Sequence, residues 1–195
     1  DSDVTVTPGK PGIPNSTTQS PLNIDADLFV IGPEAPLVDG LADQLRAQGK
    51  TVFGPGVDGA QLEGSKAWMK DLLVEANVPT AKHGTFTNED EAIAFLSDMP
   101  LPYVIKTDGL AAGKGVLVTE SVNEAKDAIK NYLSGDAFGD AGKTVVIEEG
   151  LIGNEISILA ICDGTKAVPL TPAQDYKRLL NNDEGPNTGG MGAYS

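Results

Sequence analysis

The chain has 195 residues, and 14 lysines and arginines set against 28 aspartates and glutamates give it a formal net charge of −14 at pH 7. This acidity argues against nucleic acid as a partner, because no surplus of basic side chains exists to neutralise phosphates. The single cysteine and single histidine exclude an internal disulfide framework and a multi-histidine metal site within the chain.

The first sixty residues predict the end of an open α/β domain with a parallel sheet. Residues 1–25 are rich in Pro, Gly, Ser and Thr, a composition typical of loops. The elements expected next are a buried strand over 28–31, a helix over 37–48 that ends at Gly49, and a strand over 51–53. This strand–helix–strand order assigns residues 1–60 to the remainder of such a domain.

From Ser65 onward the pattern predicts an α+β arrangement. Ser65 is expected to cap a helix whose apolar stripe, including Trp68 and Met69, faces the core. Thr87 and Glu91 flank the expected start of a second helix. The other elements expected here are strands over 103–106 and 115–118, a helix over 122–133 and a strand over 144–148.

The last part of the chain predicts a half-buried strand and a long loop. Residues 155–161 alternate between polar and apolar side chains, and Asp163 with Gly164 signals a tight turn into a strand over 167–170. Cys162 is expected to be a buried, inert thiol. The polar, glycine-rich residues 171–195 are expected to form a loop.

The segment 106–116 carries the clearest indication of a ligand. It holds two lysines and three glycines: Lys106, Gly109, Gly113, Lys114 and Gly115. The glycines let the backbone approach a ligand and cup phosphate oxygens, while the lysines supply charge. A Walker A loop is excluded, because its spacing between glycines differs and Gly115 follows the lysine. Taken alone, the segment fits a hairpin flap over a triphosphate and an ordinary glycine-rich turn equally well.

Two adjacent acids close the strand predicted over 144–148. Glu148 and Glu149 lie next to a glycine, so that backbone groups at this strand end would meet an adenine edge, and Glu155 would accept hydrogen bonds from ribose hydroxyls. Without the other motifs, a solvated acidic strand end is the preferred interpretation.

A second candidate ligand site lies near the end of the sequence. In so acidic a chain, Lys177 and Arg178 beside the glycine-rich stretch 185–192 indicate a local anion site. Asp175 is placed to hold an amine or a hydroxyl. We favour a binding loop here over a flexible linker, because Asn, Thr and Met are set regularly among the glycines.

Glu34 and Lys66 can each be interpreted either as a ligand contact or as a residue without a ligand. Glu34 follows the first predicted strand, at the sheet edge where open α/β domains bind ligands. A turn and helix start favoured by the helix dipole explains Glu34 equally well. Lys66, near the start of its helix, fits a solvated lysine, with a nucleotide contact as the alternative.

Six segments, taken in this order, resemble the phosphoribosylamine–glycine ligase (glycinamide ribonucleotide synthetase) family of ATP-grasp enzymes. They are 32–37, 61–66, 106–116, 146–149, 174–178 and 185–195. The resemblance runs from Val6 to Ser195, and its specificity comes from all six segments, since other ATP-grasp enzymes share the glycine flap. It implies that residues 61–148 form the small ATP-grasp subdomain and that 149–195 begin the large one.

The resemblance also implies a reaction of purine biosynthesis. ATP phosphorylates the glycine carboxylate, and the amine of 5-phosphoribosylamine attacks the acyl phosphate, which gives glycinamide ribonucleotide, ADP and phosphate. No side chain acts as a covalent nucleophile. The implied ATP-binding residues are Lys66, Lys106, Gly109, Gly113, Lys114, Gly115, Glu148, Glu149, Leu151 and Glu155. The implied substrate-binding residues are Glu34, Pro36, Asp175, Lys177, Arg178, Asn187, Thr188, Gly189, Gly190 and Met191.

The sequence departs from the family in ways that limit what this chain is expected to do. Family members are longer, and their ligands for Mg²⁺ (or Mn²⁺) are expected downstream of Ser195. We therefore expect a protein ending at Ser195 to be inactive, and ADP release that depends on glycine and phosphoribosylamine would contradict this.

Other functions remain as alternatives to this ligase. They are another ATP-grasp carboxylate–amine ligase or carboxylase, and a nucleotide-binding fragment without catalysis. A pyridine-nucleotide dehydrogenase is disfavoured, because no Gly-x-Gly-x-x-Gly opens a helix after a strand. No apolar run approaches membrane-spanning length, and we expect a cytoplasmic monomer whose partners are small molecules, with neither nucleic acid nor a membrane among them.

Overall fold

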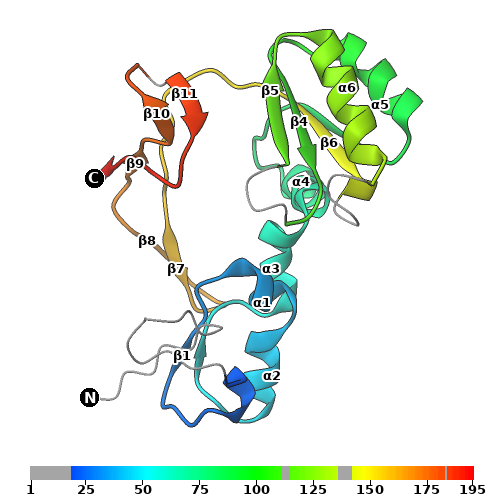
Figure 1. Cartoon of the computed structure of the whole chain (residues 1–195). Helices are drawn as coiled ribbons and strands as arrows, with labels where there is room; N and C mark the ends of the chain where they lie inside the picture. Colours follow the sequence, from blue (N-terminus) through cyan, green and yellow to red (C-terminus); the bar gives the residue numbers. More distant parts are fainter. Residues whose placement is uncertain (1–18, 111–114, 136–141, 183) are drawn as a thin grey trace. The chain divides into compact units, whose positions relative to one another are not determined.

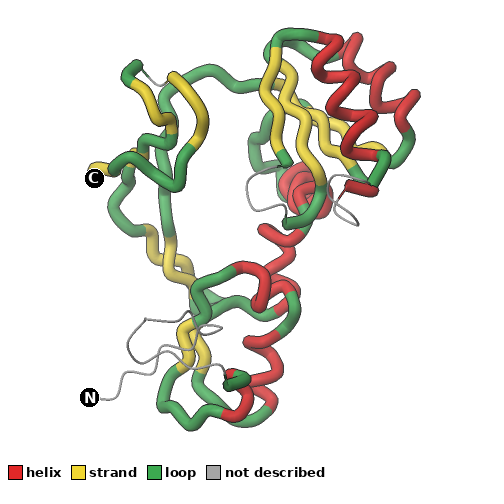
Figure 2. The backbone as a smooth tube through the Cα atoms, in the orientation of Figure 1, coloured by secondary structure: helices red, strands yellow, loops and turns green. Residues whose placement is uncertain are grey.

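The computed structural model describes residues 19–110, 115–135, 142–182 and 184–195 (Figure 1). The chain divides into two compact units, Asp1–Gly150 and Leu151–Ser195, and each is described by itself. The first unit contains a two-stranded sheet near its start and a four-stranded sheet with its own helices (Figure 2). Among the described helices, none combines the length and the apolar character needed to cross a membrane.

The N-terminal part of the first unit is built on one parallel strand pair. Its elements are the 3₁₀ turn η1 (Pro21–Asn23), β1 (Phe29–Val30), α1 (Glu34–Val38), α2 (Leu41–Ala47), β2 (Val52–Phe53) and α3 (Val57–Gly64). Strands β1 and β2 pair in parallel, which confirms the predicted strand–helix–strand order. Phe29 packs against Ile24 and Leu45, and this small core holds the helices to the strand pair.

Two predictions for this part were wrong, and α3 was not predicted. The helix expected over 37–48 is two helices, because Gly40 has a φ of +84°, a left-handed conformation that interrupts the helix. The run 28–31 was expected to be buried, but Leu28 is 54% exposed and Val30 is 66% exposed. Alternation along the strand turns only the residue between them into the core.

The rest of the first unit is an antiparallel sheet with three helices. Its strands are β3 (His83–Phe86), β4 (Tyr103–Thr107), β5 (Val116–Thr119) and β6 (Val145–Glu149), in the order β3-β6-β4-β5. Its helices are α4 (Lys66–Glu75), α5 (Glu89–Phe95) with the 3₁₀ turn η2 (Leu96–Asp98), and α6 (Val122–Leu133). The last strand in sequence, β6, therefore lies inside the sheet.

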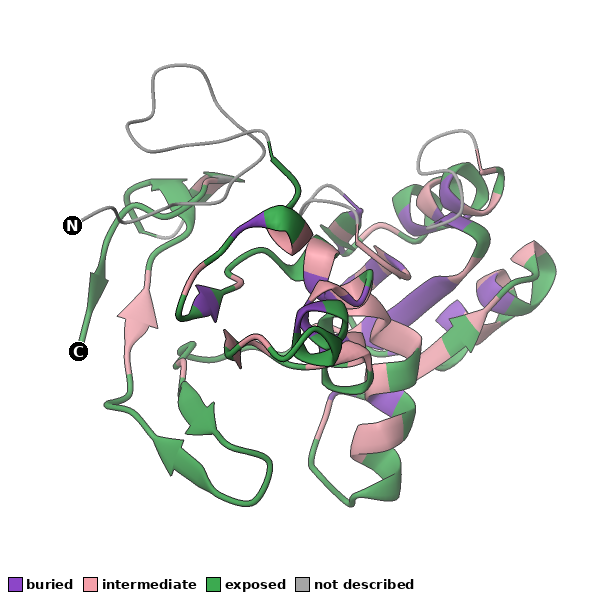
Figure 3. Cartoon of the chain, turned by 90° about the horizontal axis from the view of Figure 1, so that it is seen from below, coloured by how far each residue is buried: buried purple, intermediate pink, exposed green. Residues whose placement is uncertain are grey.

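Helices α5 and α6 lie side by side against one face of this sheet (Figure 2). Ile105 and Ile147 point from the sheet into the same cluster as Leu96 and Ile129 from the helical side, and all four are almost completely buried. In Figure 3 the buried residues gather in this sheet and under these helices. This core fixes the positions of β4 and β6, which carry the functional side chains described below.

The helix starts follow capping chemistry closely. Ser65 Oγ accepts a hydrogen bond from the Trp68 backbone N–H at 3.1 Å, which confirms the predicted cap of α4. The start of α5 at Glu89 lies between Thr87 and Glu91, as predicted, and the Asn88 side chain caps it by accepting a hydrogen bond from the Glu91 N–H at 3.1 Å. Trp68, predicted to be core, is 38% exposed, and the buried residue of α4 is Lys70 instead.

The unit Leu151–Ser195 consists of short antiparallel ribbons. The pairs are β7 (Ala160–Cys162) with β8 (Ala167–Pro169), β9 (Gln174–Asp175) with β12 (Ala193–Tyr194), and β10 (Arg178–Leu180) with β11 (Glu184–Asn187). The predicted turn is confirmed, because Gly164 has a φ of +91° between β7 and β8.

Three predictions for this unit were wrong. Residues 155–161 do not form one half-buried strand, since β7 begins at Ala160 and is exposed. Residues 171–195 contain four short strands rather than a continuous loop. Cys162 is exposed rather than buried. A two-stranded ribbon leaves side chains on both faces in solvent unless another element covers it, and Figure 3 shows this unit coloured as exposed or intermediate.

Candidate functional site

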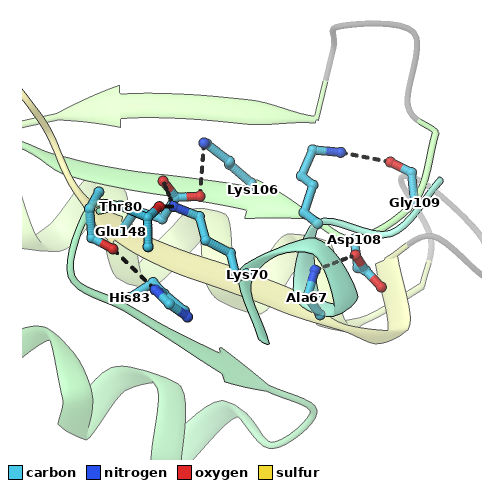
Figure 4. A network of polar contacts seen from close by, with 10 residues as sticks. Ala67, Lys70, Thr80, His83, Lys106, Asp108, Gly109 and Glu148 are labelled. Carbon is cyan, nitrogen blue, oxygen red and sulfur yellow. Dashed lines mark hydrogen bonds and ion pairs between the residues drawn. The ribbon is translucent and has the colours of Figure 1, made fainter. Parts of the chain in front are cut away.

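Three charged side chains meet beside strands β4 and β6 (Figure 4). Oε1 of Glu148 on β6 accepts a hydrogen bond from Lys106 Nζ on β4 at 2.8 Å. Oε2 of the same carboxylate lies 2.9 Å from Lys70 Nζ on α4. Lys70 also donates to Thr80 Oγ1 at 2.7 Å. We refer to Lys70, Lys106 and Glu148 as the lysine–glutamate cluster.

Strand alternation explains why these side chains meet. Ile105 and Ile147 face the core under α5 and α6, so their neighbours Lys106 and Glu148 point to the other face of the sheet. The antiparallel register pairs Lys106 with Val146, which makes Glu148 its diagonal neighbour on that face. Long side chains bridge a diagonal of this kind, and Lys70 reaches the carboxylate from α4.

The cluster carries a net positive charge that is open on one side. Burial of the Glu148 carboxyl works to raise its pKa, but hydrogen bonds and attraction from Lys106 and Lys70 outweigh burial and hold the pKa below its ordinary value. Glu148 is therefore a carboxylate at neutral pH. The side chains of Lys70 and Glu148 are 5% and 7% exposed, whereas that of Lys106 is 25% exposed. Lys106 is thus the cation of the cluster that an anionic ligand can reach.

The lowered pKa of Glu148 predicts a specific loss of stability in acid. A carboxyl whose pKa is lowered by folding stabilises the protein above the unfolded pKa and loses that contribution as pH falls through the folded pKa. We expect the free energy of unfolding to decline as pH falls below 4.5, the ordinary pKa of this carboxyl. Urea unfolding at a series of pH values measures this, and in Glu148→Gln the decline should be shallower. An equal decline in both proteins would contradict the prediction.

The base of the glycine-rich loop is tied to the start of α4. The Asp108 carboxylate accepts hydrogen bonds from Ser65 Oγ at 3.1 and 3.2 Å and from the Ala67 N–H at 3.1 Å. Lys66 Nζ donates to the Gly109 carbonyl at 2.8 Å. The Thr107 N–H donates to the carbonyl of Gly115 at 2.9 Å, across the base of the hairpin.

The hairpin itself is confirmed by the antiparallel pairing of β4 with β5. Gly109 has a φ of +77°, a conformation that favours glycine. Of the predicted loop residues, Gly113 and Lys114 lie outside the described residues. Lys66 and Gly109, predicted separately, are joined by the hydrogen bond between them.

The end of β6 is closely packed against the chain around Pro102. The Gly150 N–H donates to the Pro102 carbonyl at 2.7 Å, and a Cβ built on Gly150 would lie 2.4 Å from Pro102 Cγ. Only glycine therefore fits at this position. The Glu149 carboxylate accepts from the Lys82 N–H at 2.8 Å. Leu151, which opens the second unit, is 75% exposed.

A second group of predicted residues comes together within Leu151–Ser195. Lys177 Nζ donates to Glu155 and lies 3.7 Å from Asp175 Oδ2. The hydrogen bond from Lys177 to Glu155 raises the pKa of the lysine above its ordinary value, because it favours the charged form. Half-exposed pairs of this kind contribute little stability, so they are poor candidates for a purely structural role.

The glycine-rich stretch of this unit folds against the same lysine. The Thr188 N–H and hydroxyl both donate to the Lys177 carbonyl, at 2.7 and 2.9 Å, and the Gly190 N–H donates to Thr188 Oγ1 at 3.1 Å. The other predicted residues here lie close in sequence: Arg178 donates to the Gly185 carbonyl, Asn187 ends β11, Gly189 is exposed, and Met191 donates its N–H to the Tyr176 carbonyl.

The predicted residues of the N-terminal part lie on α1. Glu34 is the first residue of that helix and is exposed, and Pro36 is half-buried two residues later. An acidic residue in a first turn is favoured by the helix dipole. Within the described part of the chain, Glu34 is not among the polar partners of the lysine–glutamate cluster.

The described residues contain no cluster of side chains that could hold a metal ion. Within residues 19–110, 115–135, 142–182 and 184–195, no three side chains of His, Cys, Asp or Glu gather closely enough to hold a metal ion. At the lysine–glutamate cluster the one carboxylate, Glu148, is already held by two lysines, an arrangement that does not suit a divalent cation.

Two residues of the site were missed in the sequence. Lys70 lies on the stripe of an amphipathic helix, and nothing local marks it as buried. Its partner is Glu148, distant in sequence. Asp108 lies within the glycine-rich segment 106–116, and its sequence neighbours give no sign that it contacts Ser65. The contact between Ser65 and the Asp108 carboxylate forms only when distant segments come together in the fold. The capping role of Ser65 was therefore the only one of its two roles that the sequence could predict.

Comparison with known families gives two matches that together cover nearly the whole chain. The model "Phosphoribosylglycinamide synthetase, N domain" matches residues 2–63, and the model "Phosphoribosylglycinamide synthetase, ATP-grasp (A) domain" matches residues 64–195. The second match alone covers more than half of the chain. Together they confirm the predicted fold class, an N-terminal α/β domain followed by the first part of an ATP-grasp domain.

Individual relatives are named phosphoribosylamine–glycine ligase. A phosphoribosylamine–glycine ligase of Escherichia coli O6:H1 is 52% identical over 173 residues, which cover 89% of this chain and 40% of the relative. The corresponding ligase of Brucella melitensis is 55% identical over 169 residues, 87% of this chain and 39% of the relative. The chain thus spans about 40% of the length of these relatives.

Solved structures agree with the sequence matches. The chain is similar to a phosphoribosylamine–glycine ligase from Thermotoga maritima, with a TM-score of 0.76, 36% identity, and coverage of 88% of this chain and 42% of that one. A D-alanyl-alanine synthetase A from Vibrio cholerae gives a TM-score of 0.62 at 17% identity, covering 76% of this chain and 45% of that one. The second likeness shows the shared fold alone.

Proposed function

The chain belongs to the phosphoribosylglycinamide synthetase family, and from this premise we propose that it carries the ATP-binding part of an enzyme that ligates glycine to 5-phosphoribosylamine. The products are glycinamide ribonucleotide, ADP and phosphate, a step of purine biosynthesis. The observation that carries the proposal is the lysine–glutamate cluster. It presents Lys106, an accessible cation, on the strand that leads into the glycine-rich loop.

The reaction has two steps, and both need held charges rather than a covalent nucleophile on the protein. A glycine carboxylate oxygen attacks the γ-phosphorus, the bond to the β-phosphate oxygen breaks, and ADP leaves. The amine nitrogen of phosphoribosylamine then attacks the carbonyl carbon of glycyl phosphate, phosphate leaves, and the nitrogen loses a proton. Positioning and electrostatic stabilisation account for catalysis of this type.

We assign the nucleotide to the residues around the cluster and the glycine loop. Lys106 and Lys114 would contact the phosphates, Lys66 would stay at the loop base, and the backbone at Gly109, Gly113 and Gly115 would approach the phosphates. The chain end at Glu148, Glu149 and Leu151 would meet the adenine, and Glu155 the ribose. Support for these roles comes from the accessible Lys106, the tied loop base and the family membership.

The substrates are assigned to the second group of residues. Lys177 and Arg178 would hold the phosphate of phosphoribosylamine, with Asp175 on its amine or a hydroxyl. Glycine and the sugar would meet the loop residues Asn187, Thr188, Gly189, Gly190 and Met191, with Glu34 and Pro36 as further contacts. The hydrogen bonds from Thr188 to the Lys177 carbonyl support a common site for the loop and this lysine.

The remaining parts of the proposal rest on the family. We propose that ATP acts together with Mg²⁺ (or Mn²⁺), that the protein is a cytoplasmic monomer, and that its partners are small molecules rather than nucleic acid or membranes. We also propose domains over residues 1–60, 61–148 and 149–195. The strong excess of acidic residues supports the proposal that nucleic acid is not among the partners.

The proposal is tested on the intact protein, expressed from its complete coding sequence. We expect ADP release to require both glycine and 5-phosphoribosylamine, and mass spectrometry to detect glycinamide ribonucleotide. Omission of either substrate serves as the control. Release of ADP with D-alanine or bicarbonate as acceptor, and none with glycine, would assign the protein to another ATP-grasp ligase or to a carboxylase. Nucleotide binding with no turnover for any acceptor would assign it to a non-catalytic binding module.

A further inference from the structure

One charged residue of the cluster is out of reach of any ligand. Lys70 is 4% exposed, and its ammonium lies between Glu148 Oε2 and Thr80 Oγ1 (Figure 4). A buried ammonium is costly unless it is paired and hydrogen-bonded. Because a phosphate cannot contact Lys70, any effect of this residue on a bound nucleotide must pass through Glu148.

The two lysines do not compete for Glu148. Lys106 occupies Oε1 and Lys70 occupies Oε2, each at ordinary hydrogen-bond distance. Lys106 is the more exposed of the two and lies on the strand that leads into the glycine-rich loop. If the Lys106 ammonium moves to a phosphate, Oε1 loses its partner while Oε2 keeps Lys70.

We propose that Lys70 is a positioning residue for Glu148. It keeps the Glu148 carboxylate ionised and fixed in place while the Lys106 side chain moves, so that its ammonium leaves this carboxylate and contacts the phosphates of the nucleotide. The inference rests on the proposed function, because it requires a nucleotide at Lys106. It explains why a helix with an apolar stripe buries a lysine. Without Lys70, the same transfer leaves a buried carboxylate with no cation, and such a carboxylate takes up a proton.

Among the described residues, four polar or charged ones surround the Glu148 carboxylate. They are Lys106 on β4, Lys70 on α4, Thr80 before β3, and His83, the residue of β3 paired with Glu148 across the sheet. His83 holds the Ala81 carbonyl through Nδ1 at 3.1 Å. The variant Glu148→Gln removes the carboxylate and leaves His83 in place, so it separates the contribution of the carboxylate from that of the histidine.

The test is the number of protons taken up when ADP binds to the intact protein. Isothermal titration calorimetry at pH 6.5, in buffers of different ionisation enthalpy, gives this number. We expect Lys70→Met to bind ADP at least about tenfold more weakly, because binding now strips a buried carboxylate of its last cation. We also expect it to take up close to one proton more than the wild type. Comparing variant with wild type cancels the protons of ADP itself.

A double variant and a matched control separate this role from general damage. In K70M/E148Q the extra proton uptake should vanish, because no carboxylate remains. Lys126→Met removes an exposed lysine of α6 and should match the wild type in affinity and in protons. A lysine that only supported the fold would change affinity without changing proton uptake.

Several results would overturn the inference. Equal proton uptake by the wild type and K70M does so, whatever the affinities. If K70M does not fold, the wild type is compared with E148Q. The inference requires equal uptake by these two proteins, and a proton taken up by the wild type alone rejects it. A wild type that makes glycinamide ribonucleotide but fails these comparisons rejects the inference and leaves the proposed function standing. A wild type that binds no ADP rejects both.

Discussion

Replacing Lys106 with methionine should lower kcat/KM for glycine-dependent ADP release in the intact protein by about 10²–10³-fold, the range seen when one preorganised electrostatic contact to a reacting group is removed. Methionine keeps most of the length and removes the charge. Lys106 is the partly exposed cation of a cluster that is otherwise buried. Steady-state kinetics with saturating phosphoribosylamine measure the loss.

The control for this variant is Lys126→Met, which removes an exposed lysine from α6 and should leave the rate unchanged. The folded state of both variants is checked by urea unfolding. A Lys106→Met protein with the rate of the wild type would remove Lys106 from the nucleotide site and with it the observation on which the proposed function depends.

Replacing Glu148 with glutamine should lower the free energy of unfolding by about 3–5 kcal/mol, because breaking a buried ion pair by removing one partner leaves an uncompensated charge. Here the remaining charges are two ammonium groups that both lie within 3 Å of the lost carboxylate. Urea unfolding at pH 7, extrapolated to water, gives the free energy. Glu120→Gln, at an exposed position, should fall within about 0.5 kcal/mol of the wild type.

A double-mutant cycle sharpens this expectation. The loss in K70M/E148Q should be smaller than the sum of the losses in K70M and E148Q, since removing both buried charges relieves what each single change creates. Additive losses would mean that Lys70 and Glu148 do not interact energetically, in spite of the 2.9 Å that separates them.

Local chemistry made much of the fold predictable from the sequence. The helix predicted over 122–133, with its charged residues on the outer faces, is observed at these bounds, and the structure adds that Ser121 caps it. Strands β4, β5 and β6 were each placed within one residue, since their apolar runs are bounded by glycine or by acids. The order of these strands in the sheet was not predicted, because it depends on pairing between distant segments.

The failures have physical causes that a local pattern does not contain. Gly40 divides a helix whose leucine spacing continues across the break, and the left-handed conformation appears only in the folded backbone. Lys70 is buried because a carboxylate from β6 reaches it, so its partner, rather than its own segment, decides its position. The residues of the glycine-rich stretch could be identified as a candidate binding loop from their residue types. The contact of Thr188 with the Lys177 carbonyl could not be predicted, because it exists only in the folded chain.

The place of β6 in the sheet sets an order on how this part of the protein can form. Strand β3 joins the sheet only through β6, which is synthesised last of the four strands. Until residues 145–149 leave the ribosome, β3 and β4 present unpaired edges, and Lys70 and Lys106 have no carboxylate between them. Long-range pairing of this kind delays folding. The complete four-stranded sheet and the lysine–glutamate cluster therefore form only after β6 has been synthesised.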